Sequence, residues 1–92
     1  MKNIIIVHLF IDSNCDLCKT MQHELMNNPP NAEVKVTHVS RGEMYIGRAI
    51  KSFPTTRIYT YPYPYTIAEF EGFVSTEDIN AKIKEHETKF TL

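Results

Sequence analysis

The sequence has no marked excess of charge of either sign, no long hydrophobic run and only two cysteines. Ten lysines and arginines stand against eleven aspartates and glutamates, so binding to nucleic acid through phosphate neutralisation is not expected. The longest apolar stretch, residues 4–11, is interrupted by His8 and is too short to span a bilayer. No small-residue cleavage site of the secretory type follows it. These absences predict a cytoplasmic protein that binds neither membranes nor nucleic acid.

Chain length and composition predict one compact domain over residues 1–92. A chain of 92 residues is short for a domain and has room for one hydrophobic core. Apolar residues make up 42% and charged residues 23%, which is close to the average for folded soluble proteins. The composition therefore argues against a disordered chain.

The pattern of apolar residues predicts the element order βαβαββα. Residues 4–11 are apolar on both faces, which is typical of a strand that is covered on each side. The first helix has polar capping residues before it and Pro29 and Pro30 after it. The expected strands are residues 4–11, 33–39, 55–61 and 65–70, and the expected helices are residues 15–28, 40–53 and a last helix that is capped at Ser75.

These elements predict an α/β fold in which a four-stranded mixed sheet has helices on both faces. A right-handed crossover makes the first two strands parallel, and the hairpin adds an antiparallel pair. The helix over residues 40–53 is the weakest of the three, because Gly47 costs about 1 kcal/mol relative to alanine. In this arrangement Cys15 lies after the first strand, at the N-terminus of the first helix.

The two cysteines form a Cys-x-x-Cys motif, Cys15-Asp16-Leu17-Cys18. A disulfide between them closes almost no loop, so it would stabilise the fold very little. A helix N-terminus offers unpaired N–H groups and a positive dipole end, which favour a thiolate at Cys15. Asp12 and Asp16 are expected to act against this effect and to raise the pKa of Cys15, since nearby negative charge disfavours a thiolate. The spacing predicts dithiol exchange, in which Cys15 attacks and Cys18 resolves the mixed disulfide.

Two other uses of the cysteines remain open, as half of a zinc or iron–sulfur site or as inert buried thiols. Zinc needs four ligands, and the sequence has no second paired motif. The histidines are scattered over different elements: His8, His23, His38 and His86. His8 is expected to be a hydrogen-bonded imidazole in the core. Asp12 and Asp16 are equally consistent with ordinary helix-start carboxylates.

Three segments resemble the thioredoxin/glutaredoxin superfamily and follow one another in the order found there. They are the Cys-x-x-Cys motif that opens the first helix, residues 50–55 (Ile-Lys-Ser-Phe-Pro-Thr), and Gly72 before the last helix. The second segment is similar to the thioredoxin pattern Ile-[Arg/Lys]-Ser-x-Pro-Thr. The resemblance implies a thioredoxin-like fold and a cis bond between Phe53 and Pro54 beside the cysteines. It also implies that Phe53, Pro54, Thr55 and Gly72 bind the substrate.

Several positions differ from both branches of this superfamily. Asn14 stands where thioredoxins usually have a tryptophan, and Asp12 stands where many glutaredoxins have a lysine. Glu71 stands in place of the first glycine of the glutaredoxin glycine pair, before Gly72. Carboxylates at these places repel the carboxylates of glutathione. We therefore expect a thioredoxin reductase, in preference to glutathione, to supply electrons.

Together these features predict a small thiol–disulfide oxidoreductase that reduces protein disulfides. No bound cofactor or metal is expected, only a redox-active Cys15–Cys18 disulfide that a partner reductase recharges. The resemblance suggests ribonucleotide reductase as one substrate, and we expect a monomer. The competing hypothesis is a redox-silent module of the same fold, which would bind a protein partner through its cysteine face or its tyrosine-rich hairpin (residues 59–65).

Overall fold

A computed structural model describes residues 4–39, 44–45, 48–50, 52–63 and 65–90. The elements are β1 (Ile4–Ile11), α1 (Asp16–Asn27), β2 (Glu33–His38), β3 (Met44–Tyr45), β4 (Arg48–Ala49), β5 (Thr55–Tyr61), β6 (Thr66–Glu71) and α2 (Thr76–Phe90).

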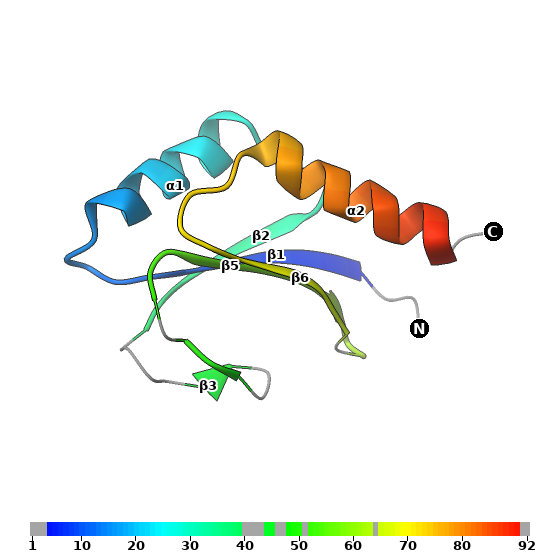
Figure 1. Cartoon of the computed structure of the whole chain (residues 1–92), viewed down its shortest axis with the longest axis horizontal. Helices are drawn as coiled ribbons and strands as arrows, with labels where there is room; N and C mark the ends of the chain where they lie inside the picture. Colours follow the sequence, from blue (N-terminus) through cyan, green and yellow to red (C-terminus); the bar gives the residue numbers. More distant parts are fainter. Residues whose placement is uncertain (1–3, 40–43, 46–47, 51, 64, 91–92) are drawn as a thin grey trace.

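The four long strands form one mixed sheet in the order β2-β1-β5-β6 (Figure 1). β1 runs parallel to β2 and antiparallel to β5, and β5 and β6 form an antiparallel hairpin. The apolar strand β1 therefore pairs with another strand along each of its two edges. The predicted α/β class and four-stranded mixed sheet are confirmed.

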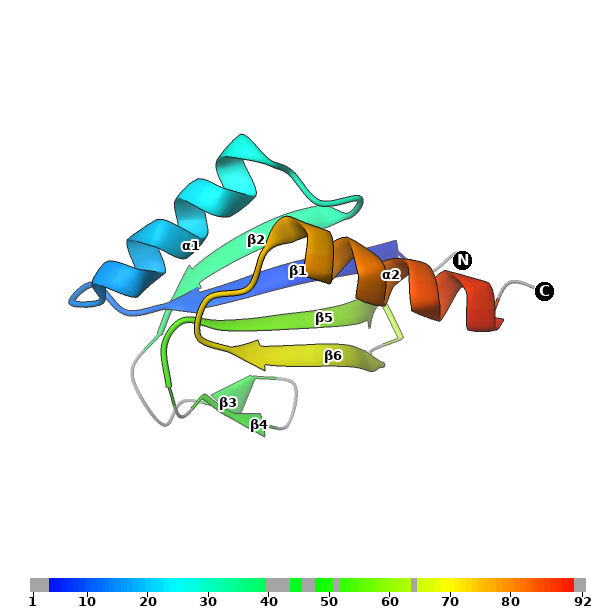
Figure 2. The ribbon, with the colours of Figure 1, turned by 45° about the horizontal axis from the view of Figure 1, so that its top comes forward.

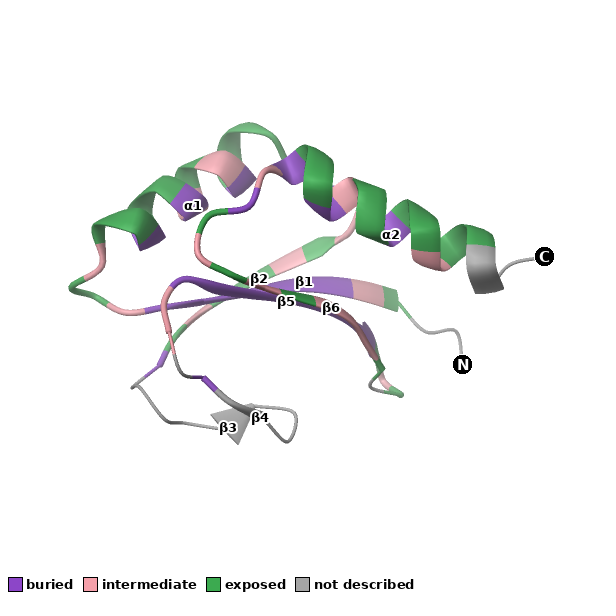
Figure 3. Ribbon diagram, viewed as in Figure 1, coloured by how far each residue is buried: buried purple, intermediate pink, exposed green. Residues whose placement is uncertain are grey.

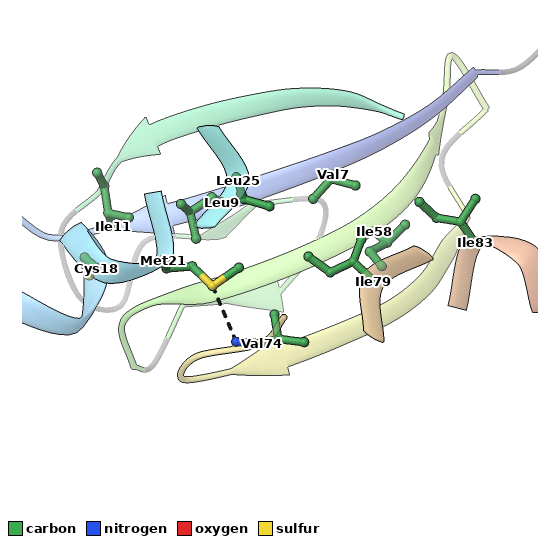
Figure 4. Close-up of a cluster of buried hydrophobic side chains, with 10 residues drawn as sticks. All are labelled: Val7, Leu9, Ile11, Cys18, Met21, Leu25, Ile58, Val74, Ile79 and Ile83. Carbon is green, nitrogen blue, oxygen red and sulfur yellow. Dashed lines mark hydrogen bonds between the residues drawn. The ribbon is translucent and has the colours of Figure 1, made fainter. Parts of the chain in front are cut away.

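Both α1 and α2 lie on the same face of the sheet, and the core fills the space between them and the strands (Figures 1 and 2). Strand side chains alternate between faces, and those of Val7, Leu9 and Ile11 point into this core. Its other buried members come from α1, β5, the loop after β6 and α2: Cys18, Met21, Leu25, Ile58, Val74, Ile79 and Ile83 (Figure 4). In Figure 3 most of β1 and β5 is buried, whereas both helices are exposed on the side away from the sheet.

The predicted helix over residues 40–53 is wrong wherever the structure describes this segment. Met44–Tyr45 and Arg48–Ala49 pair instead as the short antiparallel strands β3 and β4. They lie on the face of the sheet opposite to α1 and α2 (Figure 2), so the prediction of helices on both faces is also wrong for the described residues. Residues 40–43, where the predicted helix begins, lie outside the described residues.

Tertiary packing accounts for the apolar positions that suggested this helix. Ile50 is buried and packs with Phe10 and Val39, and Phe53 packs against the same cluster. The fold thus buries Ile50 fully and Phe53 in part without a helix. Gly47 disfavours the helical alternative on its own account.

His8 lies on this second face of the sheet and is nearly buried. Its Nδ1 is 2.8 Å from the Tyr59 hydroxyl and its Nε2 is 2.7 Å from the Thr37 hydroxyl. The expected hydrogen-bonded core imidazole is confirmed. Burial, and next the positive charges of Lys35 and Arg57, lower the pKa of His8 from 6.5 to about 4.

The free energy of unfolding is expected to fall by about 3 kcal/mol as the pH drops from 6.5 to 4, because one pKa unit corresponds to about 1.4 kcal/mol. Between these values the unfolded chain binds a proton at His8 that the folded chain does not, so the stability is complete above pH 6.5 and is lost below it. The measurement is urea unfolding followed by circular dichroism. His8→Gln should flatten this dependence, while His23→Gln, at an exposed histidine, should retain it. An unchanged slope in His8→Gln would contradict the assignment.

Candidate active site

Cys15 stands at the junction between the turn after β1 and the first residue of α1. The turn is held by Asp12, whose Oδ1 accepts the N–H of Asn14 at 3.1 Å, a common use of aspartate before a helix. Cys15 itself has an extended backbone (φ −119°, ψ 108°) and is the N-cap of α1. Its Sγ accepts the N–H of Cys18 at 3.0 Å. A cysteine sulfur therefore takes the place that a serine or aspartate oxygen usually has.

Cys15 and Cys18 are joined by a disulfide, with their Cα atoms 5.2 Å apart. Cys15 is partly exposed, whereas Cys18 is 1% exposed. Cys18 belongs to the buried apolar cluster that also contains Ile11, Met21 and Val74 (Figure 4). Cys15 is therefore the cysteine that a reaction partner in solution can approach more readily.

The surroundings of Cys15 act on a thiolate in two opposing ways. The N–H of Cys18 and the helix N-terminus stabilise a negative sulfur, since both present positive charge to it. Asp16 is the first residue of α1 and is exposed, and Asp12 is partly exposed. Asp12 and Asp16 lie three residues before and one residue after Cys15 in the sequence, and their effect on its thiolate stays a prediction.

The residues predicted to bind the substrate lie around the start of β5 and the end of β6. The Phe53–Pro54 peptide bond is cis, as the resemblance implies. The carbonyl of Pro54 accepts the N–H of Gly72 at 2.8 Å. Thr55 is buried and its hydroxyl donates to the carbonyl of Ser52 at 2.7 Å. The structure thus brings Pro54 and Gly72 together and seats Thr55 directly beside them.

Phe53 packs against two apolar clusters. It packs against the cluster that contains Cys18, as Cys15 does, and also against Phe10 on the other face of the sheet. The predicted residues Cys15, Cys18 and Phe53 therefore share one apolar cluster.

Gly72 is needed for its backbone conformation. It has φ of +84°, which other residues rarely adopt, while a Cβ there would meet nothing within 4 Å. A close approach by the described residues is therefore not the reason for this glycine.

Two exposed apolar side chains adjoin the site and were not predicted there. Leu17 is 44% exposed, and the next residue, Cys18, takes the buried position in the first turn of α1. Phe73, which follows Gly72, is 47% exposed. The exposure of Leu17 could have been predicted from the Cys-x-x-Cys motif. At a helix start, a residue between the two cysteines faces outward when the second cysteine faces the core.

Within the described ranges, no group of three or more histidine, cysteine, aspartate or glutamate side chains is arranged to hold a metal ion. No helix of the described part of the chain combines the length and the apolar character needed to cross a membrane.

Two of the solved structures that are similar to this chain show what it resembles. One is thioredoxin-2 of the malaria parasite, described as a component of the parasite's protein secretion machinery, with 26% identity and a TM-score of 0.68 over 94% of this chain and 86% of that one. The other is a malarial protein with 20% identity and a TM-score of 0.63, over 90% of this chain and 97% of that one, which shows the fold alone. No family model and no curated protein matches the chain.

Proposed function

We propose that this chain, a member of the thioredoxin-like superfamily, is a small thiol–disulfide oxidoreductase that reduces protein disulfides. The observation that carries the proposal is the division between the two sulfurs. Cys15 is reachable at the helix N-terminus, and Cys18 is buried directly behind it in the same disulfide. This is the arrangement that exchange between a dithiol and a disulfide needs.

The reaction proceeds in two exchange steps. The Cys15 thiolate attacks one sulfur of the substrate disulfide, so an S–S bond forms to Cys15 while the substrate S–S bond breaks and one substrate thiolate leaves. The Cys18 thiol then loses its proton and attacks Sγ of Cys15, which releases the second substrate sulfur. The substrate gains two electrons and two protons, and this chain is left with the Cys15–Cys18 disulfide, which a partner reductase must reduce again.

Phe53, Pro54, Thr55 and Gly72 form the proposed substrate platform. An extended substrate segment would pair with the backbone at Phe53, as a strand adds to the edge of a sheet. The packing of Phe53 and Cys15 on one cluster and the hydrogen bond between Pro54 and Gly72 support this role.

A thioredoxin reductase is the proposed electron source of this chain. We further propose that the chain is a cytoplasmic monomer and that ribonucleotide reductase is one of its substrates. Asp12 and Asp16 lie within four residues of Cys15, and Glu71 is exposed where β6 ends, opposite Thr55. Three carboxylates around the site disfavour glutathione, which itself carries carboxylates.

The test is NADPH consumption with insulin as the disulfide substrate. We expect efficient turnover with thioredoxin reductase and at least about tenfold slower turnover with glutathione and glutathione reductase at matched concentrations, because like charges placed together cost a few kcal/mol. The triple variant Asp12→Asn/Asp16→Asn/Glu71→Gln removes these charges and should bring the turnover rates with the two electron sources closer together. Efficient turnover with glutathione alone would place the protein with the glutaredoxins instead.

One observation favours the alternative of a redox-silent binding module. Tyr61, Tyr63 and Tyr65 are all more than half exposed, and the β5–β6 turn lies at the end of the sheet away from the start of α1 (Figure 1). Exposed tyrosines are frequent in protein interfaces. No insulin reduction by either electron source, with both thiols intact, would favour this module over the oxidoreductase.

A further inference from the structure

The loop between β6 and α2 is fastened to α1 by two side chains of that helix. The Sδ of Met21 accepts the N–H of Val74 at 3.4 Å, drawn as the dashed line in Figure 4. One turn further along α1, Oε2 of Glu24 accepts the N–H of Thr76 at 2.9 Å. The Thr76 hydroxyl also donates to the carbonyl of Asn28 at 2.6 Å. We call Met21 and Glu24 the loop clamp.

Met21 and Glu24 accept the backbone N–H groups of Val74 and Thr76, for which the described residues provide no other acceptor. Val74 is 6% exposed and Met21 is fully buried, so water does not replace the sulfur at this N–H. Thr76 is the first residue of α2, and the first N–H groups of a helix have no partner within it. Glu24 therefore acts as a cap supplied by another helix, and its negative charge suits the positive end of α2.

The clamp joins α1, which carries Cys18, to the loop that borders the proposed substrate platform. α1 carries Cys18 one turn before Met21, and the clamped loop begins at Gly72, whose N–H holds the carbonyl of Pro54. The pairing of Thr55 with Phe10 fixes the start of β5 beside β1, the strand that leads to Cys15, while the path from α1 through the loop places Gly72 against Pro54. A shift of the loop against α1 would therefore move the Gly72 side of the platform and leave the disulfide at its helix N-terminus.

We propose that Glu24 is a positioning residue that sets the fit of the substrate platform to the redox disulfide, an inference that rests on the proposed function. Glu24 does not touch the sulfur atoms in this structure. Its loss should therefore weaken substrate binding while the exchange chemistry of Cys15 and Cys18 stays intact. Met21 acts in the same direction with a weaker acceptor.

The experiment measures insulin reduction by the full chain with a saturating electron source. Glu24→Ala is expected to raise KM about fivefold to tenfold with kcat within about twofold, since displacement of positioning groups weakens binding without removing the reacting groups. Glu24→Gln keeps an acceptor oxygen and should restore most of the affinity. Glu77→Gln is the matched control, because Glu77 is an exposed carboxylate in the first turn of α2. Met21→Leu should raise KM by a smaller factor.

Amide hydrogen exchange of the same variants gives a readout that does not depend on turnover. Glu24→Ala should speed exchange at Gly72 and Val74 while that at Leu25, in the α1 core, stays as in the unmodified chain. An unchanged KM, an equal rise in Glu77→Gln, or unaltered exchange at Gly72 and Val74 would overturn the positioning role. If the unmodified chain reduces no disulfide, the proposed function fails, and the exchange measurement alone decides whether Glu24 holds the loop.

Discussion

Replacing Cys15 with serine is expected to reduce insulin turnover to the background rate, whereas replacing Cys18 is expected to stop the reaction at a mixed disulfide. Cys15 is the more exposed of the two cysteines, and the N–H of Cys18 that donates to its sulfur supports a thiolate. A serine hydroxyl cannot replace that thiolate as a nucleophile at neutral pH. Without the Cys18 thiol, no internal group releases the substrate sulfur from Cys15.

The adduct distinguishes these roles directly. Cys18→Ser should accumulate one substrate chain per protein molecule, and mass spectrometry of peptides should place the link on Cys15. Cys15→Ser should form little adduct under the same conditions, because Cys18 is 1% exposed. An adduct on Cys18 as the dominant product would reverse the assigned roles.

The central part of the fold could be predicted because several local signals agree there. β1 begins and ends where its apolar run does, at Ile4 and Ile11. Prolines after α1 and the capping Ser75 before α2 mark helix ends that the structure reproduces within about two residues. The cysteine pair follows from the same signals, because the helix start fixes which cysteine is reachable.

The segment over residues 40–53 could not be predicted because its apolar spacing fits two structures. Ile50 and Phe53 lie at helical spacing, yet they pack against Phe10 from the opposite face of the sheet. The spacing of apolar residues in a sequence predicts that their side chains will be buried, but it does not identify the element that buries them. In this segment tertiary contacts override a weak helical preference that Gly47 lowers further.

The contacts between distant residues also could not be predicted. Glu24 is a surface-type residue in the helical pattern, and only the fold brings its carboxylate to Thr76, 52 positions away. Arg57 and Glu69 face each other because of the register of β5 and β6, which has an irregularity between Ile58 and Tyr59. Strand register is set by packing and turn geometry, so the sequence alone does not identify such pairs.

Removal of the Glu69 carboxylate is expected to have the largest effect on stability. Arg57 is 0% exposed, and its Nε donates to Oε1 of Glu69 at 2.6 Å. The guanidinium also lies 5.4 Å from the centre of the Phe10 ring. Breaking a buried ion pair from one side costs about 3–5 kcal/mol, because the remaining charge is left in a poorly solvated place.

Glu69→Ala should therefore lower the free energy of unfolding by about 3 kcal/mol, the lower end of that range, since the Glu69 side chain is 25% exposed. Urea unfolding followed by circular dichroism measures the change. Glu71→Ala is the matched control, because Glu71 lies two residues further along β6, is exposed, and is opposite Thr55 on β5. This substitution should lower the free energy of unfolding by less than about 0.5 kcal/mol. Arg57→Met/Glu69→Met removes both charges and should be more stable than Glu69→Ala, as hydrophobic replacements of buried pairs usually are. Equal losses in Glu69→Ala and Glu71→Ala would show that the contact with Arg57 contributes nothing specific.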